Sequence, residues 1–266
     1  MTWTEQTIAR FEAGEISREI ALARLLLSGE APDPDTLPAP LAELARAQGD
    51  RLDHLAGLAR DGFDADDVAG AASLFDRLST TAPEASVAFY SLGDPALLAQ
   101  ATDELVATIR AWTPVEGARV LDFGCGIGRV AAALTPFARE VVGVDVSAGM
   151  VEQARARASA PNLRFEQTDG RTLAGFGEAA FDLVFAADSF PFLVRAGVLE
   201  PQLAEIARVL RPGGDLLAFN WSYRGDDEDD DAEAAELAER HGFDLLRTGE
   251  RPFRIWDGRG FHLRRR

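Results

Sequence analysis

Strand-like and helix-like segments alternate along this chain from about residue 100 to its end. The first strand-like segment, residues 118–123, is a near-continuous apolar run of the kind found in strands that are buried on both faces. Four more strand-like segments follow at residues 140–145, 162–167, 181–188 and 214–221. Strands joined through helices form βαβ units with right-handed crossovers, which makes their sheet parallel. Residues 243–253 and 258–265 have no helix between them, which predicts an antiparallel pair completing a mostly parallel, seven-stranded sheet of the α/β class.

The first 85 residues have a helical pattern throughout. Ser17 is placed to cap a first helix, and four prolines within residues 31–40 form a semi-rigid connector after it. A second helical stretch is expected to end at Gly62, and its apolar side consists of Leu41, Leu44, Leu52, Leu55 and Leu58. A third stretch carries Val68, Ala72, Phe75 and Leu78. We therefore expect an N-terminal α-helical module at residues 1–85 and an α/β domain at residues 86–266.

The composition excludes several classes of protein. With 27 basic and 44 acidic residues, the formal charge is −17, which argues against a nucleic-acid partner because phosphate contacts depend on Lys and Arg. No apolar run approaches the roughly 20 residues that span a bilayer, and the first 15 residues do not form a signal peptide, so we expect a cytoplasmic protein with no membrane partner. Cys125 is the only cysteine, so no disulfide or CxxC pattern exists and no metal site is expected.

The segment VLDFGCGIGR, residues 120–129, carries the strongest functional signal. A buried strand leads through Asp122 into a turn that contains Gly124, Gly126 and Gly128. Glycines allow a positive φ and let the backbone pass close to a ligand. The turn is expected to present backbone N–H groups and a helix N-terminus at the carboxyl ends of the strands, where open α/β sheets bind ligands. Taken alone, the segment is also consistent with a tight strand–helix turn that binds nothing.

Carboxylates after the next two strands extend this candidate site. Asp145 ends the second strand, where it is able to accept hydrogen bonds from both hydroxyls of a ribose, and Asp169 follows the third strand. The segment LRPGG, residues 210–214, then leads from a helix into another strand. Together these elements resemble the class I S-adenosylmethionine-dependent methyltransferases of the small-molecule type, over residues 86–266. The resemblance implies a Rossmann-like fold, S-adenosyl-L-methionine as cofactor and a small-molecule methyl acceptor.

The resemblance also assigns parts of the cofactor to particular residues. Asp122 is expected to meet the methionine ammonium, directly or through water, and Asp145 is expected to hold the ribose. Ala187 and Asp188 are expected beside the sulfonium and the acceptor. The other expected contacts are Gly124, Cys125 and Gly126 for the methionine part, Val146 and Met150 for the adenine face, Asp169 and Gly170 for the adenine edge, and Tyr90 from a segment folded over the cofactor.

A nicotinamide-dependent dehydrogenase is the natural competitor, because Asp145 follows the glycine turn at about the distance expected of a ribose-binding acid. The dinucleotide fingerprint G-x-G-x-x-G requires a third glycine, and counting from Gly124 that position is Arg129. The acidic residue just before the first glycine, Asp122, also suits a cationic amino acid better than a pyrophosphate, which it would repel. Both observations favour the methyltransferase.

Methyl transfer from a cationic sulfur is an in-line displacement, so positioning supplies much of the catalysis. A general base is needed only when the acceptor must lose a proton, and Asp188 is the best-placed candidate. Trp221 and Tyr223 are candidates for lining an acceptor pocket, with ordinary core packing as the alternative. The Asn/Asp-Pro-Pro-aromatic signature of amino-methylating enzymes is absent, since residues 188–192 read DSFPF, and this argues against nucleic-acid bases and protein amides.

Several alternatives remain open at this point. The chain is either an enzyme or a non-catalytic protein that binds the cofactor, and an RNA or protein methyltransferase is a further rival. The helical module either covers the acceptor site or forms a homodimer. The six acidic residues 226–231 are interpreted as a solvated loop before a helix N-terminus, and the terminal arginines 264–266 as a solvated tail.

Overall fold

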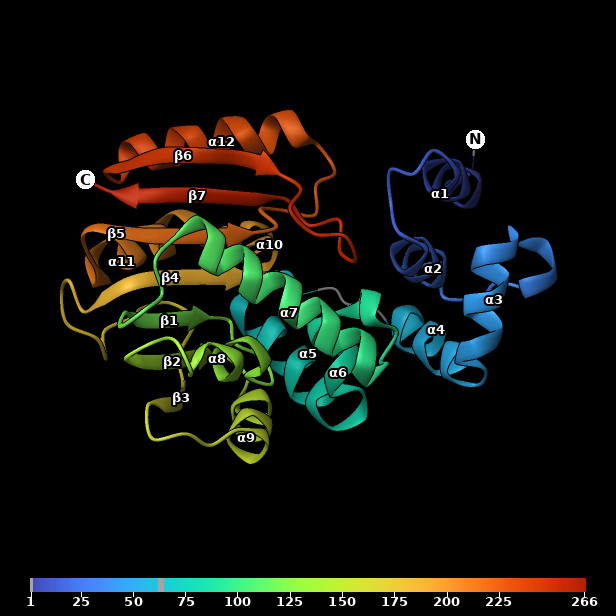
Figure 1. Ribbon diagram of the computed structural model, residues 1–266, viewed down its shortest axis with the longest axis horizontal. Helices are drawn as coiled ribbons and strands as arrows, with labels where there is room; N and C mark the ends of the chain where they lie inside the picture. Colours follow the sequence, from blue (N-terminus) through green and yellow to red (C-terminus); the bar gives the residue numbers. More distant parts are fainter. Residues whose placement is uncertain (1, 62–64) are drawn as a thin grey trace. The chain divides into compact units, whose positions relative to one another are not determined.

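The computed structural model describes residues 2–61 and 65–266, which form two compact units (Figure 1). The helical unit holds residues 2–61, 82–104 and 253–257, and the sheet unit holds residues 65–81, 105–252 and 258–266. The chain therefore does not pass from one unit to the other at a single boundary near residue 85. The helix of residues 68–81 belongs to the sheet unit, although it precedes part of the helical unit in sequence.

The sheet unit contains seven strands in the order β3-β2-β1-β4-β5-β7-β6 (Figure 1). They are β1 (Arg119–Phe123), β2 (Glu140–Asp145), β3 (Leu163–Gln167), β4 (Phe181–Ala187), β5 (Leu210–Phe219), β6 (Phe243–Glu250) and β7 (Gly260–Arg265). The first five strands pair in parallel, and β7 pairs antiparallel with both β5 and β6. The predicted fold class is confirmed, including the antiparallel pair at the end of the chain.

The sheet unit also contains helices, one of which precedes β1 while the others lie between consecutive strands in the sequence. They are α5 (Val68–Thr81), α8 (Arg129–Leu134), α9 (Ala148–Arg157), α10 (Phe190–Arg195), α11 (Leu199–Val209) and α12 (Asp227–Arg240). Leu121, Val184 and Leu216 on the central strands are completely buried, as expected for strands covered on both faces. The apolar runs of the sequence thus form the central core, and the polar residues that follow them lie at the carboxyl ends of the strands.

The helical unit follows the predicted pattern with one difference. It contains α1 (Trp3–Glu12), α2 (Arg18–Leu26), η1 (Pro34–Thr36), α3 (Ala39–Gln48), α4 (Arg51–Asp61), α6 (Pro83–Val87), η2 (Phe89–Ser91) and the first part of α7 (Pro95–Trp112). Ser17 caps α2 as predicted, because its Oγ accepts a hydrogen bond of 3.1 Å from the Ile20 N–H. The second helical stretch is divided between α3 and α4 by Gly49, whose φ is 54°. The expected helix end at Gly62 lies outside the described residues.

Among residues 2–61 and 65–266, no helix combines the length and the apolar character that crossing a membrane requires.

Candidate active site

The glycine turn between β1 and α8 is tightly packed. Gly124 and Gly128 have φ values of 77° and 75°, which side chains rarely adopt. A Cβ on Gly124 would lie 2.5 Å from Cβ of Ser189, and one on Gly128 would lie 2.5 Å from the Phe165 ring. Glycine is therefore required at both positions for conformation and for space.

The backbone N–H groups of this turn do not all face a ligand, which corrects the sequence-based expectation. Gly124 and Cys125 both donate to the Val144 carbonyl of β2, each at 2.9 Å, and Gly126 donates to Asp145. These bonds join the end of β1 to the end of β2. The turn therefore contributes to the site mainly by fixing the side chains of β1 and β2.

Asp122 on β1 is a buried carboxylate with an unsatisfied oxygen. It is 3% exposed, and its Oδ2 accepts no hydrogen bond from the described residues. The pKa of Asp122 is raised to about 8, mainly by burial and also by the nearby Asp145 carboxylate, against the opposing effect of Arg129. A buried acceptor of this kind is stabilised by a cation or a hydrogen-bond donor. The residues around Asp122 thus fit the ammonium group of an amino acid.

Asp145 at the end of β2 is held in one orientation by backbone groups. Its Oδ2 accepts from the Gly126 N–H at 2.8 Å, and its Oδ1 accepts from the Ser147 N–H at 2.9 Å. Burial raises the pKa of Asp145, and these two hydrogen bonds oppose the rise. Because each carboxylate oxygen has a second lone pair, both oxygens can still accept a hydroxyl from a ligand.

After β3, Asp169 and Gly170 form a compact bend. Asp169 is exposed, and its Oδ1 accepts from the N–H groups of Arg171 and Thr172, which lower its pKa and keep it ionised. Gly170 has a φ of 64°, and a Cβ there would lie 2.5 Å from the side chains of both Val146 and Val68. The bend therefore packs closely against the residue after β2 and against α5.

Sequence reasoning missed Asp76, which lies on α5 beside the end of β2. Its Oδ1 accepts hydrogen bonds from Ser147 Oγ at 2.6 Å and from the Gly149 N–H at 2.9 Å. Ser147 Oγ in turn accepts from the Met150 N–H at 3.0 Å and caps α9. Asp76 is about 70 residues from these partners in sequence, and no local pattern marks it. It makes α5 part of the wall next to Asp145.

After β4 and β5, two non-glycine residues adopt left-handed backbone conformations. Asp188 has a φ of 62° and Asn220 a φ of 71°. The Asn220 side-chain amide donates to Asp188 Oδ1 at 2.7 Å, and the Asp188 N–H donates to the Phe219 carbonyl at 2.8 Å. Such strained conformations concentrate at functional sites. Asn220 is a second residue that sequence reasoning missed, because only the folded sheet brings it to Asp188.

The two predicted acceptor residues have different surroundings. Trp221 is completely buried between Phe190 and Phe261, and its indole N–H donates to Glu233 at 2.9 Å. Tyr223 is 57% exposed, and its ring meets the half-buried Phe192 edge-to-face at a centroid distance of 5.8 Å. Tyr223 is thus the one of the pair with surface available to another molecule.

The remaining predicted residues are placed as follows. Val146 and Ala187 are partly buried at the ends of β2 and β4, whereas Met150 is completely buried. Cys125 is also buried, and its pKa is raised well above the ordinary thiol range by burial, so the thiol is not a nucleophile at neutral pH. Tyr90 belongs to the helical unit, where its ring stacks on Trp256 at a centroid distance of 5.6 Å.

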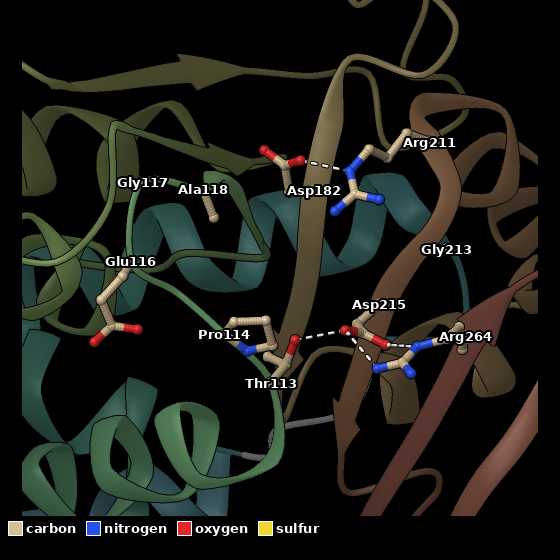
Figure 2. Close-up of a pocket in the computed structure, with 10 residues that line it drawn as sticks. All are labelled: Thr113, Pro114, Glu116, Gly117, Ala118, Asp182, Arg211, Gly213, Asp215 and Arg264. Carbon is tan, nitrogen blue, oxygen red and sulfur yellow. Dashed lines mark hydrogen bonds and ion pairs between the residues drawn. The ribbon is translucent and has the colours of Figure 1, made fainter.

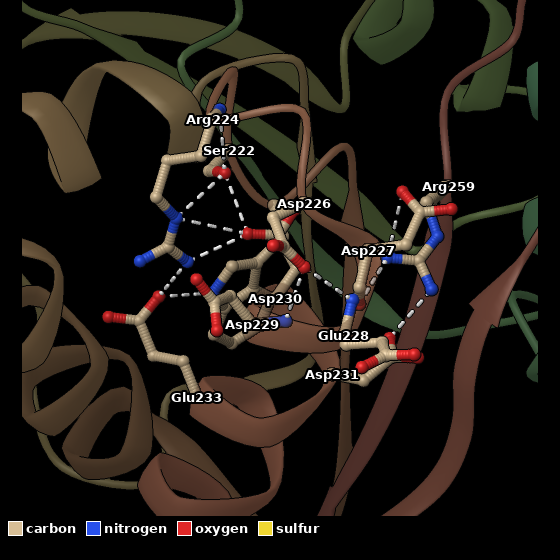
Figure 3. Close-up of polar contacts among 11 residues, drawn as sticks. Ser222, Arg224, Asp226, Asp227, Glu228, Asp229, Asp230, Asp231, Glu233 and Arg259 are labelled. Carbon is tan, nitrogen blue, oxygen red and sulfur yellow. Dashed lines mark hydrogen bonds and ion pairs between the residues drawn. The ribbon is translucent and has the colours of Figure 1, made fainter.

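The acidic run at residues 226–231 begins α12 instead of forming a loop before it, while residues 226–229 are exposed to solvent as predicted (Figure 3). Asp226 caps α12, and the other five acids form the first turns of that helix. Asp230 is buried and pairs with Arg224 at 2.7 Å, while Asp231 pairs with Arg259 at 2.7 Å. No group of three or more potential metal ligands occurs among the residues described. The run is therefore structural, since α12 benefits from acids at its N-terminus.

The terminal arginines are likewise integrated into the sheet. Arg264 lies in β7 and pairs with Asp215 at 2.9 Å, and together with Thr113 it lines a pocket of about 210 Å³ (Figure 2). The Thr113 hydroxyl and Arg211 are hydrogen-bonded to acids of the same pocket, Asp215 and Asp182. The pocket lies beside the amino ends of β4 and β5, away from the glycine turn. Its two arginines pair with its two aspartates, and Glu116 pairs with Arg110 outside the pocket.

Comparison with known proteins agrees with this geometry. Residues 120–214, from β1 to the start of β5, match the family described as a methyltransferase domain. This part of the chain is thus similar to a methyltransferase domain. The predicted resemblance to this class is thus confirmed.

Curated relatives match parts of this chain. One is a demethylmenaquinone methyltransferase from Clavibacter sepedonicus, 39% identical over 131 residues that cover 47% of this chain and 51% of the relative. Another is an S-adenosyl-L-methionine-dependent Diels-Alderase from Talaromyces variabilis. It is 39% identical over a match that covers 37% of this chain and 34% of the relative. The chain spans about half, or less, of the length of these relatives.

Solved structures share the fold of the sheet unit. Magnesium protoporphyrin IX methyltransferase from Synechocystis PCC 6803, solved with bound SAM, superposes with a TM-score of 0.56 at 20% identity. The match covers 77% of this chain and 100% of that one. At this identity the likeness shows that the methyltransferase domain has the class I fold.

Proposed function

We propose that this protein is an S-adenosylmethionine-dependent methyltransferase that acts on a small molecule. The observation that carries the proposal is Asp122, a buried carboxylate with an unsatisfied oxygen beside the glycine turn. An ammonium group satisfies it, whereas the pyrophosphate of a nicotinamide dinucleotide would be repelled. The match of residues 120–214 to the methyltransferase domain family supports the same reading.

Each part of the cofactor has residues that fit it. Asp122 would hold the methionine ammonium next to Gly124, Cys125 and Gly126. Asp145, fixed by two backbone N–H groups, would accept both ribose hydroxyls. The adenine would lie against Val146, with its amino group donating to the ionised Asp169 beside Gly170.

When bound, S-adenosylmethionine supplies a methyl group made electrophilic by a cationic sulfur. The residues of the chain align the methyl donor with the acceptor and exclude water from both. The methyl transfer then proceeds within one complex, as an intramolecular reaction does. Ala187 and Asp188 at the end of β4 would face the reacting atoms. Where the acceptor must lose a proton, the Asp188 carboxylate receives it.

A small-molecule acceptor is supported by charge and by the relatives. The formal charge of −17 disfavours tracking a nucleic-acid backbone. Relatives carry the names of enzymes for demethylmenaquinone and for ubiquinone biosynthesis, which are small-molecule reactions. An RNA or protein acceptor would instead call for a basic or peptide-sized surface.

A non-catalytic or differently catalytic cofactor-binding protein is the second candidate. The specific observation in its favour is the relative named as a Diels-Alderase that depends on S-adenosyl-L-methionine. The two candidates differ in whether S-adenosylhomocysteine is formed.

For the helical unit, we propose that it either covers the acceptor or pairs two copies of the chain. Sedimentation analysis with and without S-adenosylhomocysteine separates these roles. A monomer whose acceptor KM rises when surface residues of the helical unit are substituted indicates a cover, and a stable dimer indicates pairing.

The proposed function is tested by calorimetric titration with S-adenosylmethionine, S-adenosylhomocysteine and NADH in parallel. Micromolar binding of the first two alone is expected. Binding of NADH alone, or of none of the three, would contradict the proposal. Formation of S-adenosylhomocysteine with a cell metabolite extract then separates the enzyme from a protein that only binds the cofactor.

A further inference from the structure

The sheet order divides the carboxyl edge into two halves. Successive parallel strands run from β1 to β3 in one direction and from β4 to β5 in the other, so the topological switch point lies between β1 and β4. Open α/β sheets bind their ligands at such a point. Asp122, Asp145 and Asp169 lie in or just after the carboxyl-terminal parts of strands of the first half. A second reactant therefore belongs to the other half, at the ends of β4 and β5; this step rests on the proposed function.

The segments that follow β4 and β5 are joined by a polar contact. Asn220 donates to Asp188 Oδ1 at 2.7 Å, and both residues have left-handed backbone conformations. A left-handed conformation is unfavourable for a residue with a side chain. Asp188 is only partly buried, so its carboxylate is fixed in direction without being closed off. The pair thus aims an oriented proton acceptor from the end of β4.

The same two segments are joined a second time by aromatic rings. Phe192 follows Asp188 by four residues and Tyr223 follows Asn220 by three, and their rings meet at a centroid distance of 5.8 Å. On its other side Phe192 meets Phe75 of α5 at 5.1 Å. Tyr223 itself is 57% exposed. An exposed ring that packs on another aromatic ring offers a surface for a further flat ring.

From this arrangement we infer that the methyl acceptor is a planar aromatic compound with a phenolic hydroxyl. Its ring lies against Tyr223 and Phe192, and its hydroxyl is directed to Asp188. The acceptor oxygen forms a bond to the methyl carbon while the carbon–sulfur bond of S-adenosylmethionine breaks. The electron pair of that bond stays on sulfur, which gives S-adenosylhomocysteine, and the hydroxyl proton passes to the Asp188 carboxylate.

The chemistry of Asp188 selects a phenol over an aliphatic alcohol. A phenolic hydroxyl has a pKa of about 10, as in tyrosine, whereas the hydroxyl of an alkanol is far less acidic. A carboxylate is a weak base, so it assists removal of the more acidic proton far better. Asn220 acts as a positioning residue because its side-chain amide donates to Asp188 Oδ1 and so fixes the direction of that carboxylate.

The test uses 2-naphthol as the probe and the full-length protein saturated with S-adenosylhomocysteine. Its dissociation constant is measured by naphthol fluorescence, next to decahydro-2-naphthol as a saturated competitor. We expect 2-naphthol to bind, the competitor to displace it poorly, and Tyr223→Ala to weaken binding by about tenfold, as loss of one ring contact predicts. Leu246→Ala is the matched control, since it removes a 46% exposed apolar side chain from β6.

Three results would overturn the inference: no naphthol binding up to millimolar concentration, equal binding of the saturated competitor, or equal effects of Tyr223→Ala and Leu246→Ala. Calorimetry with S-adenosylhomocysteine on the same sample keeps the two proposals apart. If that molecule does not bind, the proposed function fails; if it binds and naphthol does not, only the acceptor class fails.

Discussion

The buried carboxylate of Asp122 makes a quantitative prediction about cofactor binding and pH. In the free protein its pKa is raised to about 8 by burial. If the ionised form binds the methionine ammonium, affinity is proportional to the fraction of Asp122 that has lost its proton. That fraction is about 1% at pH 6 and about one half at pH 8, so the dissociation constant should fall about fiftyfold between these values. Close to one proton should be released per cofactor bound at pH 6.

The same group predicts an unusual pH dependence of stability. The folded state holds its proton up to about pH 8, whereas the unfolded carboxyl releases it near its ordinary value of 3.8. The folded state therefore binds more protons in this window, and stability falls as pH rises through it, by about 6 kcal/mol at most. Asp122→Asn should flatten this dependence.

The assay is calorimetric titration of S-adenosylhomocysteine at pH 6, 7 and 8 in two buffers that differ in ionisation enthalpy, which yields the proton count. Asp169→Asn is the control. Asp169 is exposed and its pKa is lowered, so this variant should weaken binding without changing the pH slope. An affinity that stays constant from pH 6 to 8, with no proton release, would refute the argument for Asp122.

Three further predictions follow from the site. Asp145→Ala should weaken S-adenosylmethionine binding by more than tenfold, about 1.4 kcal/mol or above, and an unchanged constant in a folded variant would argue against the ribose role. Gly128→Ala should lower the free energy of unfolding by about 1–3 kcal/mol more than the control Gly117→Ala, as measured by urea denaturation. Both glycines have φ near 75°, but only a side chain at Gly128 would clash with Phe165. Asn220→Gly keeps the backbone conformation and removes the hydrogen-bond donor to Asp188. It should therefore lower kcat about tenfold for an accepted phenol and leave KM unchanged. An equal loss in kcat and in affinity would contradict the positioning role of Asn220.

The central fold was predictable from the sequence because its signals are local. Apolar runs bounded by turns define β1, β2 and β4, and the absence of a helix between β6 and β7 predicts their antiparallel pairing. The carboxylates at strand ends were also predictable, because parallel strands bring their carboxyl ends to one edge. Local pattern and long-range structure agree in this part of the chain.

Residues that act through long-range contacts could not be predicted. Asp76 has the appearance of an ordinary exposed acid on a helix, yet it meets Ser147, 71 residues away. Asn220 was read as part of a strand, and its bond to Asp188 depends on the pairing of β4 with β5. Composition likewise suggested a solvated acidic run, because sequence alone does not show that Arg224 and Arg259 face it.

The interleaved division of the chain has a genetic consequence. Because the helical unit is assembled from three separate stretches of sequence, no single recombination point would exchange it for another module. A cut at residue 85 would remove α5 and the hydrogen bonds of Asp76 from the sheet unit while leaving residues 86–104 and 253–257 without most of their unit. The two units must therefore be inherited together, and changes of acceptor are expected to arise by point substitution around the ends of β4 and β5 rather than by shuffling of modules.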